Sequence, residues 1–114
     1  MAAPTESTAL AGLERLIAAG KESALLRFGL GNEYFKRGDA AAAAVNFRRA
    51  VELDPSYSAA WKMLGKALVA AQRVDEALAA WSDGMVAAQR KGDKQALREM
   101  EVFRRRLAKE HGRE

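Results

Sequence analysis

The chain of 114 residues contains no cysteine and only one histidine, His111, close to its end. Without cysteine it cannot form a disulfide framework, a thiol nucleophile or a cysteine-ligated zinc or iron–sulfur site. One histidine is too few for a histidine-rich metal site, and the carboxylates are dispersed at predicted helix ends rather than paired for acid–base chemistry. We therefore expect no enzymatic activity, no cofactor, no metal and no small-molecule substrate.

Proline occurs only at positions 4 and 55, and valine, isoleucine and threonine are scarce. The remaining composition, rich in alanine, leucine, glutamate, arginine and lysine, favours helices. A chain of this length can form one compact domain with its own core. No apolar run approaches the roughly 18 residues that span a bilayer. The first residues do not resemble a secretory signal, so the expected location is the cytoplasm.

The net charge is +4, from 19 basic and 15 acidic residues spread along the chain. This mild excess favours acidic or mixed protein partners over nucleic acid. The strongest basic run is Arg104–Arg106, with Glu99, Glu101 and Glu110 interspersed around it. We interpret the run as the solvated face of a terminal helix, so neither nucleic acid nor a membrane surface is the expected partner.

Apolar residues recur at steps of three and four along most of the chain, as in helices with one buried face. Six helices are predicted, over residues 7–19, 24–37, 40–53, 58–71, 74–90 and 93–109. Gly38 suits the left-handed end of one helix, and Asp39 can cap the next. Pro55 ends the third helix, and Ser58 is a candidate cap for the fourth.

When the sequence is aligned with itself after a shift of 34 residues, residues of similar size coincide. The aligned pairs are Leu30 with Leu64, Gly31 with Gly65, Ala43 with Ala77, and Phe47 with Trp81. Small residues allow two helices to approach closely, and large rings fill the space between neighbouring hairpins. The chain therefore contains a packing repeat of helix pairs.

Residues 24–57 and 58–91 resemble the tetratricopeptide repeat, whose pattern is W-x₂-L-G-x₂-Y, then A-x₃-F, then P. The first window matches at Leu30, Gly31, Tyr34, Ala43, Phe47, Ala50 and Pro55. The second matches at Trp61, Leu64, Gly65 and Ala77, and Trp81 supplies the aromatic ring. Four residues depart from the pattern: Arg27 replaces Trp, Leu68 replaces Tyr, Gly84 replaces Ala and Gln89 replaces Pro. Without that proline, the fifth helix can continue to Lys91.

The resemblance implies an all-α solenoid fragment of antiparallel helix hairpins, forming one structural domain. A flanking segment, residues 1–23, would precede the two repeats, and a capping segment, residues 92–114, would follow them. Isolated hairpins cannot bury both faces, so the flanking helices would cover the ends. The function that this family implies is a non-enzymatic adaptor or scaffold that binds a protein or peptide.

In the family, the first helix of each repeat lines a concave groove that holds an extended peptide. Transferred by register, the groove residues are Phe28, Asn32, Phe35, Lys62, Met63, Lys66 and Val69. The two lysines would select acidic or carboxylate groups. However, Phe28 and Met63 replace a Lys and an Asn of the family's carboxylate clamp, so recognition of chaperone tails is not predicted.

Three alternatives remain open at this stage. Lys62 and Lys66 could simply solvate an exposed face whose apolar neighbours pack on the flanking helices. The chain could be a self-associating assembly subunit, because a short solenoid leaves its edges exposed. More distantly, the basic carboxyl-terminal helix could bind nucleic acid or a membrane surface.

Overall fold

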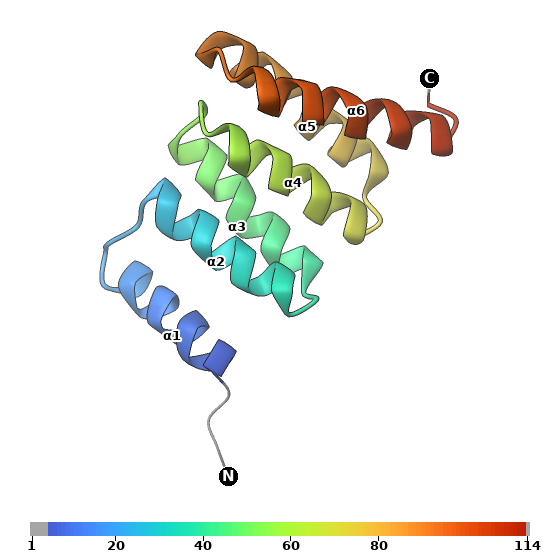
Figure 1. The fold of residues 1–114 in the computed structure, drawn as a ribbon. Helices are drawn as coiled ribbons and strands as arrows, with labels where there is room; N and C mark the ends of the chain where they lie inside the picture. Colours follow the sequence, from blue (N-terminus) through green and yellow to red (C-terminus); the bar gives the residue numbers. More distant parts are fainter. Residues whose placement is uncertain (1–4, 114) are drawn as a thin grey trace.

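The computed structural model describes residues 5–113, and all regular structure in this range is α-helical. The helices are α1 (Thr5–Ala18), α2 (Ala24–Lys36), α3 (Ala40–Leu53), α4 (Ser58–Ala70), α5 (Val74–Lys91) and α6 (Lys94–Glu110). Consecutive helices pack as antiparallel neighbours, which gives an elongated stack with extents of 49 × 29 × 19 Å (Figure 1). The predicted all-α hairpin architecture is confirmed. The predicted helix boundaries agree within two residues.

Gly38 and Asp39 act as the sequence indicates, whereas Ser58 does not. Gly38 and Gly92 have φ of 82° and 80°, in the left-handed region where glycine carries no Cβ penalty. Asp39 caps α3, because its Oδ1 accepts a hydrogen bond from the backbone N–H of Ala42 at 3.1 Å. The prediction for Ser58 was wrong: it is the first residue of α4, 3% exposed, and its hydroxyl makes no hydrogen bond among the described residues.

Close helix contact within each hairpin depends on a glycine opposite an aromatic ring. A Cβ built on Gly65 would lie 2.1 Å from Trp81 Nε1, and one built on Gly31 would lie 2.7 Å from the Phe47 ring. Trp81 and Phe47 are 4% and 0% exposed. Trp81 Nε1 also donates a hydrogen bond to the carbonyl oxygen of Lys62 at 3.1 Å. Each ring therefore lies almost directly on the backbone of the facing helix.

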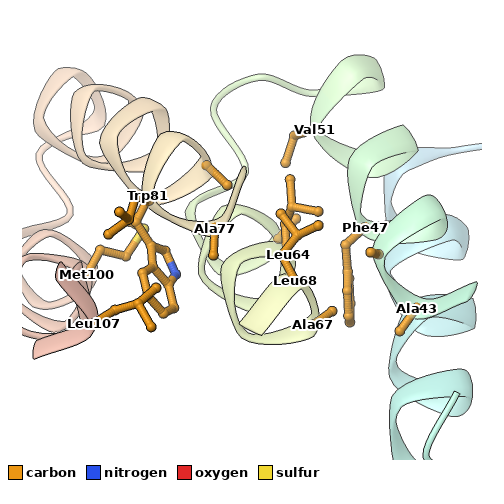
Figure 2. Close-up of a cluster of buried hydrophobic side chains, with 14 of the residues drawn as sticks. Ala43, Phe47, Val51, Leu64, Ala67, Leu68, Ala77, Trp81, Met100 and Leu107 are labelled. Carbon is orange, nitrogen blue, oxygen red and sulfur yellow. The ribbon is translucent and has the colours of Figure 1, made fainter. Parts of the chain in front are cut away.

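The core continues from one hairpin to the next through α4. Figure 2 shows Leu64 and Leu68 between the Phe47 ring on one side and the Trp81 side chain on the other. Both leucines are at most 1% exposed. Trp81 also approaches Phe103 of α6, with ring centroids 5.5 Å apart. The two repeats and α6 therefore share a single hydrophobic core.

One departure of the second repeat, Gly84, is explained by the packing of α6. A Cβ on Gly84 would lie 2.6 Å from both Met100 Sδ and Trp61 Cβ, so even alanine would be too large here. Met100 is fully buried. Because no proline stands at position 89, α5 extends to Lys91 before Gly92 ends it. The longer α5 gives α6 a long surface to pack on.

The first repeat replaces the expected Trp with a polar network around Arg27. Arg27 Nε donates to Glu22 Oε2 at 2.8 Å, and its terminal nitrogen donates to Asn46 Oδ1 at 2.9 Å. Arg49 of α3 also donates to Glu22, at 2.9 and 3.1 Å. These bonds lower the pKa of Glu22 from 4.5 to about 2, with Arg49 the larger cause and Arg27 the second. Glu22 thus connects the α1–α2 turn to both helices of the first hairpin.

The glycine contacts generate a stability prediction. Gly65→Ala should destabilise the fold by about 1–3 kcal/mol, because the added methyl overlaps the Trp81 ring. Gly12→Ala is the matched control: nothing lies within 4 Å of its Cβ position, so alanine should be neutral or should stabilise by up to about 1 kcal/mol. Urea unfolding measures both. Equal effects of the two substitutions would contradict the packing account.

The Glu22 network generates a pH prediction. Since the pKa of Glu22 is lower in the folded state, its contribution to the free energy of unfolding is fully present above the ordinary value of 4.5. That contribution is lost as the pH falls from 4.5 through about 2. Glu22→Gln should therefore be less stable than the wild type at neutral pH. The difference should shrink through this window, as measured by chemical unfolding at several pH values. A pH-independent difference would contradict the pairing.

Candidate protein-interaction face

The first helices of the two hairpins and the last helix follow one another along one side of the stack. In Figure 1, α2, α4 and α6 run across the molecule in succession, with α3 and α5 behind them. The sequence-predicted groove residues all belong to α2 and α4. We call the exposed surface of these three helices the α2/α4/α6 face.

The apolar residues of the predicted groove are largely used for packing. Phe28 lies 4.9 Å from the Tyr57 ring and 5.7 Å from the Phe47 ring, measured between centroids. Burial raises the pKa of the Tyr57 hydroxyl, and the nearby Asp54 raises it further. Phe35, Met63 and Val69 are also only half-buried and pack against the core. These side chains leave part of their surface available on the face.

Both lysines of the predicted groove contact α6. Lys62 Nζ lies 3.0 Å from Glu99 Oε1, with the side chains 26% and 37% exposed. Lys66 Nζ lies 5.1 Å from the centroid of the Phe103 ring, within range of a cation–π interaction, and Lys66 remains exposed. Lys62 therefore already has a carboxylate partner within the chain, whereas Lys66 has an aromatic neighbour and no ion pair among the described residues.

Asn32 is half-buried on α2, and its side-chain amide makes no hydrogen bond to another described residue. An amide has both donors and an acceptor and so can pair with a peptide backbone. Asn32 and Lys66 occupy the same place in successive repeats. They are the two polar residues of the predicted set that no described hydrogen bond or ion pair occupies.

The contribution of α6 to this face was not anticipated from the sequence. Glu99 was expected on the solvated surface of α6, but it lies against Lys62. Likewise, Arg104 is half-buried, and its Nε donates to Ser82 Oγ of α5 at 2.6 Å. The apolar stripe of Leu97, Met100, Phe103 and Leu107 indicated which side of α6 is buried. That stripe does not indicate which lysine Glu99 will meet, because the pairing with Lys62 depends on how α6 crosses α4.

No group of three residues able to hold a metal ion occurs within residues 5–113. No helix in this range has both the length and the apolar composition needed to cross a membrane.

The comparisons with known proteins agree with this geometry. The sequence profile of the tetratricopeptide repeat matches residues 28–93, more than half of the chain. The chain belongs to the tetratricopeptide repeat family. A relative, the TPR repeat-containing protein PA0015 of Pseudomonas aeruginosa, is 53% identical over 96 residues, covering 84% of this chain and 91% of the relative.

Solved structures show the same arrangement of helices. The solution structure of protein BPP2914 from Bordetella parapertussis matches with a TM-score of 0.76 and 42% identity, over 96% of this chain and 91% of that one. A tetratricopeptide repeat domain protein from Salinibacter ruber matches with a TM-score of 0.70 and 28% identity, over 75% and 87%. The tetratricopeptide repeat fold generally mediates interactions between proteins.

The Lys62–Glu99 pair generates a third prediction. Lys62→Glu should destabilise the protein slightly by placing two carboxylates together, and adding Glu99→Lys should recover most of the loss. A double-mutant cycle should give a coupling of about 0.2–1 kcal/mol, because both side chains are partly exposed. A coupling of zero would mean that the pair does not hold α6 on α4 in solution.

Proposed function

We propose that this tetratricopeptide repeat protein is a non-enzymatic interaction module that binds an extended peptide segment of a partner protein on its α2/α4/α6 face. The supporting observation is that the polar groups of Asn32 and Lys66 are available to a ligand. The Asn32 amide makes no hydrogen bond to another described residue, and Lys66 is exposed beside an aromatic ring. Partly exposed Phe28 and Phe35 supply apolar surface on α2 next to Asn32. Met63 and Val69 extend that surface on α4.

The proposed ligand carries an acidic side chain or a free carboxylate. Lys66 is the residue that would select it, because Lys62 is neutralised by Glu99 within the chain. A ligand carboxylate could still displace Glu99, since partly exposed ion pairs contribute little to stability. Asn32 would bind the peptide backbone, and the half-buried apolar side chains would provide most of the contact area. The proposed location is the cytoplasm.

A second candidate function is self-association as an assembly subunit. At the amino-terminal end of the stack, Leu16 of α1 is 44% exposed and Leu25 of α2 is 69% exposed. Exposed leucines at the end of a helical stack favour contact with a further helix. Sedimentation over a range of concentrations separates the two functions, because a monomer at high concentration contradicts self-association and leaves peptide binding unaffected.

Titration of the labelled protein with extended acidic peptides tests the proposed function. Amide shifts should centre on α2, α4 and α6, and Lys66→Glu should weaken binding by about tenfold or more through loss of a charge-assisted contact. Lys91→Glu, an equal change of charge at the end of α5, is the matched control and should leave affinity nearly unchanged. Shifts confined to α3 and α5, or equal losses in both variants, would overturn the proposal.

A further inference from the structure

A pocket of about 350 Å³ opens over α3 and shares no residue with the predicted peptide groove. Four arginines line it: Arg27 from α2, Arg48 and Arg49 from α3, and Arg73 from the α4–α5 turn. Val45, 64% exposed, lies among them. The pocket therefore combines exposed apolar surface with several guanidinium groups.

Three of the four arginines have carboxylate partners. Glu22 accepts hydrogen bonds from both Arg27 and Arg49, and Arg49 also pairs with Glu52 at 3.3 Å. Arg73 pairs with Glu76 through two hydrogen bonds, at 2.9 and 2.6 Å.

Arg48 has no carboxylate within 4.0 Å among the residues whose side chains the structure describes. The hydrogen bonds from Arg73 are the main cause of the lowered pKa of nearby Glu76, and the positive charge of Arg48 adds a smaller contribution. Four guanidinium groups thus face three carboxylates, and the uncompensated charge lies on Arg48.

The existing ion pairs leave room for an external carboxylate. The Arg73 and Glu76 side chains are 44% and 50% exposed, and such exposed pairs contribute little to stability. Exchanging one carboxylate partner for another therefore costs little. The planar fork of an arginine guanidinium matches a carboxylate with two parallel hydrogen bonds. Arg48 and Arg73 can both present such groups at the pocket, while Arg27 and Arg49 remain held by Glu22.

We infer that this pocket binds an acidic peptide segment of a partner protein, with a ligand carboxylate on Arg48 and a neighbouring apolar side chain on Val45. A nucleic acid fits the pocket poorly, because its affinity comes from several phosphates on a row of cations, and here three carboxylates stand among the arginines. Together with the α2/α4/α6 face, the protein would then present two separate surfaces for acidic segments, as expected of a scaffold.

Amide-shift mapping on the full chain tests this inference. The probe is a short synthetic peptide in which glutamate alternates with leucine, and the comparison probe has lysine in place of glutamate. Inorganic phosphate alone forms a third arm. We expect the glutamate peptide to shift the amides around Val45 and Arg48, and we expect the lysine peptide and phosphate to leave them unchanged.

Two variants and one control determine the outcome. Arg48→Ala breaks no described ion pair, so it should fold normally and weaken the glutamate peptide at this pocket by about tenfold, equivalent to about 1.4 kcal/mol. Val45→Glu, at an exposed position, should abolish these shifts by adding a like charge. Arg90→Ala, the loss of an exposed arginine on α5, should change nothing. The inference is overturned if millimolar glutamate peptide causes no shifts at Val45 and Arg48, or if phosphate alone causes them. It is also overturned if Arg48→Ala leaves the shifts unchanged, or if Arg90→Ala reduces them as much as Arg48→Ala does.

Discussion

The contact of an aromatic ring with a glycine backbone is the interaction on which the rest of this structure depends. Trp81 over Gly65 and Phe47 over Gly31 set the separation of the two helices in each hairpin, because any larger residue at the glycine would displace the ring. Their position also brings Leu64 and Leu68 between successive rings (Figure 2). The repeats consequently stack in one register, which places α2, α4 and α6 on a common side.

That register determines which side chains remain available for a ligand. Lys62 and Lys66 look equivalent in the sequence, but their surroundings differ in the folded protein. Lys62 pairs with Glu99 of α6, whereas Lys66 lies beside the Phe103 ring and stays exposed. The capping helix therefore has two roles. It closes the core through Met100 and Leu107, and it supplies an acidic and an aromatic residue to the face next to α4.

Two departures from the repeat pattern, at Gly84 and Arg27, are each accommodated by specific contacts in the fold. Gly84 provides the space that Met100 and Trp61 need, so the loss of a consensus alanine allows α6 to dock closely. Arg27 replaces a tryptophan, and its guanidinium is satisfied by Glu22 and Asn46. Arg49 extends this charge along α3, where it pairs with both Glu22 and Glu52. The pocket beside Arg48 is part of this charged surface.

The sequence alone determined the helical class, the two repeats, the six helices to within two residues and the places of Gly31, Gly65, Phe47 and Trp81. These features depend on periodicity, residue size and backbone conformation, which are local and repeat at a fixed spacing. The tertiary structure alone decided the pairing of Lys62 with Glu99, the burial of Ser58 and the gathering of four arginines around Val45. Such features depend on how helices that are distant in the sequence cross one another. The residues next to a charged side chain on a helix surface do not indicate which residue of another helix will pack against it.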